Sequence, residues 1–187
     1  MGKFNSRKTV GHSGAVYGYS TSFLVLPTEK LAVIILGNED IANGRIHRIQ
    51  RTALSLLLNA KFGDQLPSKP EPYVPNDLTK FAGEFESKSY WAKIKLVDGK
   101  LVGDISGQPT YFSPTGELTF KANSRINDSS NVRFEENEGS AVIGFEMSGQ
   151  RYVRIPDNPT PLPSEWRSVL GSYGLDFIPL VITERHG

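Results

Sequence analysis

The sequence predicts an α+β fold in which a strand hairpin and one helix precede an antiparallel β domain. Two short apolar runs followed by a stretch of helical period lie near the N-terminus. Strand-like runs at even spacing, separated by turn residues, fill residues 78–156. A proline-rich stretch separates the two parts. At 187 residues, the chain is long enough for one medium domain or one and a half small ones.

The two apolar runs predict an antiparallel hairpin. Residues 21–27 read TSFLVLP, residues 31–36 read LAVIIL, and a turn signal from Pro27 to Lys30 lies between them. Both runs are apolar at nearly every position, which indicates that both faces of the hairpin are covered. One helix covers only one face. We therefore expect exposed apolar surface on the other face and, from it, self-association or dependence on a partner.

Residues 43–63 are predicted to form the helix that covers the first face. Asn43 is a candidate N-cap residue, and Gly63 is a candidate C′ residue. The apolar residues that recur at helical spacing, and are expected to pack on the hairpin, are Ile46, Ile49, Ala53, Leu56, Leu57 and Ala60. Three arginines are expected to face water: Arg45, Arg48 and Arg51.

The stretch DQLPSKPEPYVPND predicts an extended linker because its prolines favour a semi-rigid chain. The predicted boundaries are residues 1–63 for the first part, 64–76 for the linker and 77–157 for the β domain. Inside the β domain, Asp98-Gly99 lies between two strand-like runs, which is a strong hairpin signal. The even spacing of the later runs favours an antiparallel sandwich or barrel.

A weak internal repeat adds a further segment. Residues 75–99 align without gaps with residues 163–187, and both copies have a glycine two positions before an aromatic residue, Gly83 with Phe85 and Gly171 with Tyr173. Residues 158–187 are therefore predicted to begin a second, truncated β unit. Such a half-built unit leaves unpaired strand edges.

Composition excludes several classes of function. The formal net charge is +1 with scattered Lys and Arg, so nucleic acid is not expected as a partner. No apolar run is long enough for a membrane span, and no signal peptide is visible, which leaves the compartment open. The chain has no cysteine, and its 3 histidines show no metal-ligand spacing. No metal or other cofactor is expected.

The stretch GHSGAVYGYS, residues 11–20, has two interpretations: the polar entry to a strand or the edge of an active site. Neighbouring residues of a strand point to opposite faces. For this reason His12 and Ser13 are not expected to act together as a base and a nucleophile.

From about Thr9 to Phe62, the order of this motif, the hairpin and the helix resembles the third-motif region of the serine β-lactamase and penicillin-binding-protein superfamily. It is most similar to the class C-like hydrolases and esterases, which carry His-x-Gly or Lys-[Ser/Thr]-Gly on the strand beside the active site. The later stretch, with FAGEFES and its spaced Gly, aromatic and Gly-Gln-Pro positions, is similar to the lipocalin-like β domain found C-terminal to some of these hydrolases.

The resemblance implies roles for four residues. His12 would be a polar group beside the proton path of the nucleophile, and Ser13 would offer a hydroxyl to a substrate carboxylate or carbonyl. Gly14 would keep the strand edge open to substrate. The backbone N–H of Ala15 would be one of two oxyanion-hole donors. The parent's substrate would be a small molecule or peptide with an ester, amide or β-lactam carbonyl.

The family also needs a nucleophilic Ser followed three residues later by Lys, and no serine of this chain has that spacing. The family's second motif should come before the His-x-Gly strand. Ser129-Ser130-Asn131 fits that motif but lies in the β domain, after His12-Ser13-Gly14, so it is interpreted as a turn. We expect the C-terminal part of a serine hydrolase, inactive alone, whose partner is the upstream part of the hydrolase domain. The alternative is a non-catalytic lipocalin-like binding or assembly module.

Overall fold

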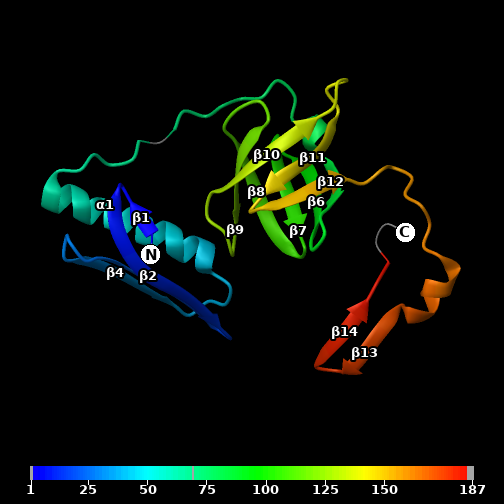
Figure 1. Cartoon of the computed structure of the whole chain (residues 1–187), viewed down its shortest axis with the longest axis horizontal. Helices are drawn as coiled ribbons and strands as arrows, with labels where there is room; N and C mark the ends of the chain where they lie inside the picture. Colours follow the sequence, from blue (N-terminus) through cyan, green and yellow to red (C-terminus); the bar gives the residue numbers. More distant parts are fainter. Residues whose placement is uncertain (1, 69, 185–187) are drawn as a thin grey trace.

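The computed structural model describes residues 2–68 and 70–184, which are mostly β (Figure 1). They form a four-stranded antiparallel sheet with one α-helix, a closed barrel and a two-stranded hairpin. Among these residues, no helix combines the length and the apolarity needed to cross a membrane. The strands of the first sheet, in spatial order, are β1 (Gly2–Phe4), β2 (Arg7–Val16), β3 (Tyr19–Leu26) and β4 (Leu31–Gly37).

β3 and β4 confirm the predicted hairpin. Leu26 pairs with Leu31, and the N–H of Lys30 donates to the carbonyl of Pro27 at 3.3 Å to close the turn. Alternate residues of β3 are buried against the helix, including Ser20, Ser22 and Leu26. The remaining residues of β3 point to the other face of the sheet.

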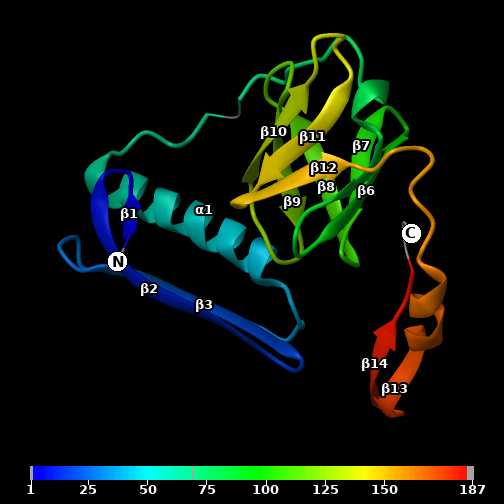
Figure 2. The same cartoon turned by 45° about the vertical axis from the view of Figure 1, so that its right-hand side comes forward.

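The helix α1 (Asn43–Phe62) packs on one face of this sheet (Figure 2). Its C-terminal end is as predicted, because Gly63 is left-handed with φ 73° and its N–H donates to the carbonyl of Asn59 at 2.8 Å. The N-terminal prediction is wrong. The N-cap residue is Ala42, without a side-chain cap bond, and Asn43 is already helical.

The buried stripe of α1 also differs from the predicted one. Ile49, Leu56 and Leu57 are exposed. The buried stripe instead contains residues four positions apart: Ile46, Gln50, Leu54 and Leu58. Gln50 can occupy it because its Nε2 donates to the carbonyl of Val33 at 3.2 Å, which satisfies a polar group that would otherwise favour water.

The sheet face away from α1, here called the open face, is apolar and exposed. Residues 34 and 36 of β4 show this most clearly, since Ile34 is 66% exposed and Leu36 is 78% exposed. The other large apolar side chains on this face are Val10, Val16, Tyr19 and Phe23. No described element lies beneath it (Figure 2). The predicted exposed apolar surface is therefore confirmed.

The β domain is a closed antiparallel barrel in which strands adjacent in sequence are neighbours and β12 pairs with β5. Its strands are β5 (Gly83–Glu86), β6 (Trp91–Val97), β7 (Lys100–Ile105), β8 (Gln108–Pro114), β9 (Thr119–Ser124), β10 (Ser130–Glu136), β11 (Val142–Met147) and β12 (Gln150–Arg154). The predicted hairpin at Asp98-Gly99 is confirmed, with φ values of 48° and 70° that fit a type I′ turn. Of the two architectures expected, the barrel is the one formed.

One end of the barrel is closed by a 3₁₀ helix, η1 (Thr79–Phe81), and by Arg154. Phe81 is fully buried, edge-on to Phe120 with ring centroids 4.9 Å apart. The guanidinium of Arg154 donates to the carbonyls of Lys80, Ala82 and Val142 at 2.7, 2.9 and 2.6 Å. These bonds tie the end of β12 to η1, to the residue just before β5 and to the start of β11.

The C-terminal segment contains η2 (Ser164–Val169), β13 (Gly171–Leu175) and β14 (Ile178–Ile182). Its strand register equals that of β5 and β6 when the two repeats are aligned. Gly83 pairs with Ile94, as Gly171 pairs with Ile182. The two glycines have φ values of 156° and 154°. The sequence repeat is thus matched by a structural one, although residues 185–187 of the predicted unit lie outside the described residues.

Candidate functional site

The four residues singled out from the sequence lie on a stretch of β2 that has one free edge. β2 pairs with β1 only through residues 7–9 and with β3 through residues 10–16. Within the described part of the chain, no strand covers the other edge of β2 beyond Thr9. His12, Ser13, Gly14 and Ala15 all belong to this uncovered stretch.

Backbone groups of Ser13 and Ala15 point to the free edge. In antiparallel sheets, hydrogen-bonded pairs alternate with non-hydrogen-bonded pairs. The two-residue loop between β2 and β3 closes on the pair Val16–Tyr19, which is the hydrogen-bonded type in such hairpins. Ser13 and Ala15 therefore fall at positions that are not bonded to β3. Their N–H and C=O groups are directed outward, where a substrate could meet them.

The side chains of His12 and Ser13 lie on opposite faces of the sheet. His12 is opposite Phe23, on the open face. Ser13 is opposite Ser22, whose Oγ donates to Oε1 of Gln50 at 3.1 Å on the helix side. Neither His12 nor Ser13 has a side-chain hydrogen bond or ion pair to a described residue. The structure thus separates the two side chains by the alternation expected of a strand.

The start of α1 is tied to this strand by bonds that the sequence did not indicate. Nδ2 of Asn43 donates to the carbonyl of Gly14 at 3.3 Å. The hydroxyl of Ser20 accepts the N–H of Ala42 at 2.9 Å and donates to the carbonyl of Glu39 at 2.8 Å. These contacts join residues far apart in sequence, so no local signal could have predicted them.

Arg7, the first residue of β2, is engaged with two carboxylates. The guanidinium of Arg7 bonds the carboxylate of Asp64, with Nη2 to Oδ1 at 2.8 Å, and lies 3.3 Å from Glu29. These hydrogen bonds lower the pKa of Asp64, so this carboxyl stays ionised. Glu39 pairs with Arg45 at 2.9 Å. On the uncovered stretch of β2, residues 10–16, the ionisable side chain is that of His12.

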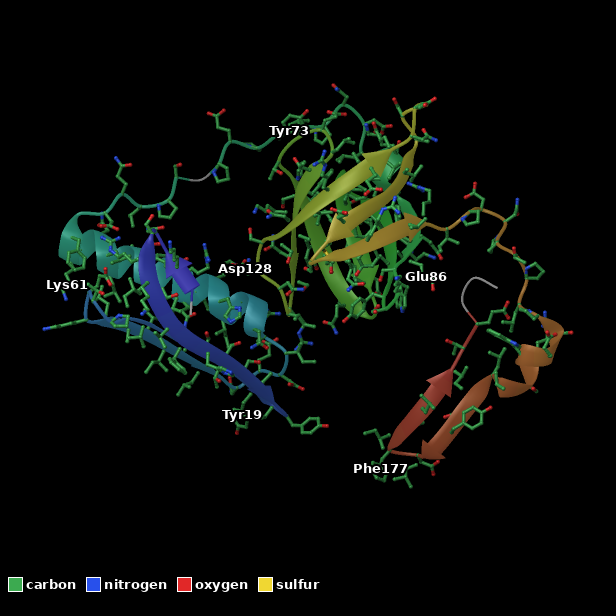
Figure 3. All side chains as sticks on the ribbon, viewed as in Figure 1. Tyr19, Lys61, Tyr73, Glu86, Asp128 and Phe177 are labelled. Atoms are coloured by element: carbon green, nitrogen blue, oxygen red, sulfur yellow. The ribbon has the colours of Figure 1, made fainter. Side chains whose placement is uncertain are left out.

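The barrel docks on α1 through the loop between β9 and β10. The N–H of Gly44 donates to the carbonyl of Arg125 at 2.7 Å. A Cβ atom at Gly44 would lie 2.6 Å from the carbonyl oxygen of Ser124, so only glycine fits this close approach. Arg48 forms an ion pair at 3.3 Å with Asp128, which lies between the barrel and α1 (Figure 3).

No family model matches the chain, and no curated protein matches it. A crystal structure of SurE with D-Leu is similar to this chain with 18% identity and a TM-score of 0.39. The similarity covers 78% of this chain and 35% of the SurE chain. Another crystal structure of SurE is similar over 77% and 34%, with 18% identity and a TM-score of 0.40. The chain spans about a third of the length of these solved proteins. Similarity at this level assigns neither a fold nor a function.

Proposed function

We propose that this chain is the C-terminal part of a β-lactamase-like serine hydrolase and that it is inactive alone. In the parent protein, a serine outside these residues would attack an ester, amide or β-lactam carbonyl, and water would then release the acyl group. The chain would contribute the strand that forms one wall of the site. It would not contribute the nucleophile, since no Ser-x-x-Lys spacing occurs in it.

The observation that carries this proposal is the free edge of β2. A hydrolase of this kind needs a backbone N–H aimed at the oxygen on which negative charge develops. The N–H of Ala15 points outward and is free to donate to such an oxygen, and Gly14 beside it places no side chain at the edge. The hairpin and α1 follow the strand in the order that the family resemblance implies.

The open face supports the second part of the proposal, an upstream partner segment. His12 lies on the same face as Phe23 and Ile34. Whatever covers these apolar residues must also approach His12. A covering segment that carried the missing nucleophile would therefore bring it to the side of the sheet where an imidazole can accept or pass a proton.

For the barrel we propose the finer assignment of a lipocalin-like β domain, supported by its eight-strand up-and-down topology. We further propose that residues 158–187 begin a second unit of the same kind, after residues 1–63, a linker at 64–76 and the barrel at 77–157. The equal register of the two hairpins supports this division. Tyr173 and Ile182, exposed here, align with the core residues Phe85 and Ile94.

A His12→Ala substitution in the parent protein tests the hydrolase proposal. With nitrophenyl acetate as substrate, we expect kcat/KM to fall by about 100-fold or more, since a positioned proton-transfer group contributes on this scale. Ester hydrolysis by protein purified from its native cells measures the effect.

The matched control is Lys8→Ala, an exposed residue on the same strand and the same face. It should leave kcat/KM unchanged. Equal activity of the His12→Ala variant and the unchanged protein would contradict the role of His12. Covalent labelling of any serine of this chain by a fluorophosphonate, with the chain alone, would contradict its inactivity.

A further inference from the structure

The docking of the barrel on α1 leaves a cavity between these two parts, here called the α1–barrel cavity. One wall is α1, the opposite wall is β9 with the β9–β10 loop, and Leu24 of β3 completes the lining. Asp128 of that loop marks its place between the helix and the barrel (Figure 3). The cavity has a volume of about 560 Å³, which lies in the range of pockets that bind small molecules.

Basic side chains line this cavity from both walls. His47 and Arg51 are four residues apart on α1, so they lie on the same face of the helix. Lys121 of β9 lines the cavity from the barrel side. Among the described residues, none of these three side chains pairs with a carboxylate. The fold therefore brings together like charges from two separate parts of the chain, and such charges repel unless an anion lies between them.

The carboxylate in the lining is already engaged. Among the described residues that line the cavity, Asp128 is the one with a carboxylate. It forms its ion pair with Arg48, which lies outside this lining, and its side chain is only 14% exposed. Because Arg48 compensates this carboxylate, the charges of Arg51 and Lys121 are left uncompensated. The cavity therefore carries an excess of positive charge.

The donors of these basic groups are placed for a ligand. The guanidinium of Arg51 lies over the ring of Phe4, 5.5 Å from its centroid. This contact fixes the guanidinium through its face, and within the described part of the chain no hydrogen bond uses its N–H groups. Nζ of Lys121 donates to Oδ1 of Asn131, which leaves two of its three N–H groups for another acceptor.

The wall formed by the β9–β10 loop is held in place. Within the loop, the N–H of Ser129 donates to Oδ1 of Asn123 at 2.9 Å. From the side of α1, the loop is fixed by the bond from the N–H of Gly44 to the carbonyl of Arg125. A ligand would therefore meet a preformed wall, which reduces the entropy lost on binding.

We propose that the α1–barrel cavity binds a small polycarboxylate, an organic molecule with two or three carboxylate groups. One carboxylate meets Arg51, whose guanidinium can donate two parallel N–H···O bonds, and His47, whose imidazole has an N–H donor in either protonation state. A second carboxylate meets Lys121 on the opposite wall. An anion with a single charged group would reach only one wall. A polycarboxylate that bridges both walls also stabilises the docking of the barrel on α1. This inference does not depend on the hydrolase proposal.

Citrate, a tricarboxylate, is the probe that tests this proposal. We expect citrate to bind the full chain and to shift the amide NMR signals of Asn127 and Ser129. Arg51→Ala and Lys121→Ala should each weaken binding by about tenfold or more, because each removes hydrogen bonds between charged groups. Asp128→Asn should strengthen binding by about three- to tenfold, because it removes a repelling carboxylate and releases the guanidinium paired with it. Acetate, with one carboxylate, should bind about tenfold or more weakly than citrate, because it can meet only one wall.

Arg45→Ala is the matched control. It removes the same charge from the same helix, but Arg45 pairs with Glu39 at 2.9 Å and lies outside the lining of the cavity. This variant should bind citrate like the unchanged chain. The proposal would be overturned by a dissociation constant that neither Arg51→Ala nor Lys121→Ala changes, or that Arg45→Ala raises as much as they do. Weaker citrate binding by the Asp128→Asn variant would also overturn it.

Discussion

The chain is expected to self-associate through its open face, and the double substitution Ile34→Lys with Leu36→Lys should weaken that association by about 100-fold or more. Burying an exposed Ile or Leu side chain contributes about 1.5–3 kcal/mol, and both residues are more than half exposed in the single chain, at 66% and 78%. The substitutions remove both contributions and add charges that resist burial. Sedimentation velocity over a range of concentrations measures the effect.

Leu56→Lys is the control for this experiment. Leu56 is also about half exposed, at 52%, but it lies on α1 and outside the open face. Its replacement should leave the association constant unchanged. A monodisperse monomer of the unchanged chain at all concentrations would contradict the prediction.

Phe134→Ala should cost the barrel about 3–5 kcal/mol of stability, the largest effect expected of a single substitution in this chain. Phe134 is 1% exposed and packs against four other rings. Those rings belong to Phe81, Phe85, Phe120 and Phe145. Removing the central ring leaves a cavity that these neighbours cannot refill. Urea unfolding followed by tryptophan fluorescence measures the loss.

Two further variants make this result interpretable. Phe134→Leu keeps most of the apolar volume and should cost about 1 kcal/mol, so the barrel remains folded. Tyr111→Ala, at a position 60% exposed on the outside of β8, should change stability by about 0.5 kcal/mol or less. If Phe134→Ala were no more destabilising than Tyr111→Ala, the aromatic cluster would not be the core of the barrel.

Features set by local signals could be predicted from the sequence. The turn at Asp98-Gly99 needs two positive φ values, and those two residue types favour them. The hairpin of β3 and β4 and the end of α1 at Gly63 followed from similar local patterns. On the candidate site, strand alternation was enough to place His12 and Ser13 on opposite faces.

Features that depend on distant residues could not be predicted. The buried stripe of α1 is set by Gln50, a polar residue that is satisfied only once Ser22 and Val33 are beside it. Closure of the barrel rests on the pairing of β12 with β5, and the guanidinium of Arg154 joins their ends.

The mass of the protein in its native cells tests the central proposal most directly. An antibody against the barrel would detect every species that carries it, and intact-mass measurement would size them. We expect a species much heavier than 20.7 kDa, because the hydrolase proposal requires a nucleophile that these residues do not supply. A single species of 20.7 kDa would contradict the proposal that this chain is one part of a serine hydrolase.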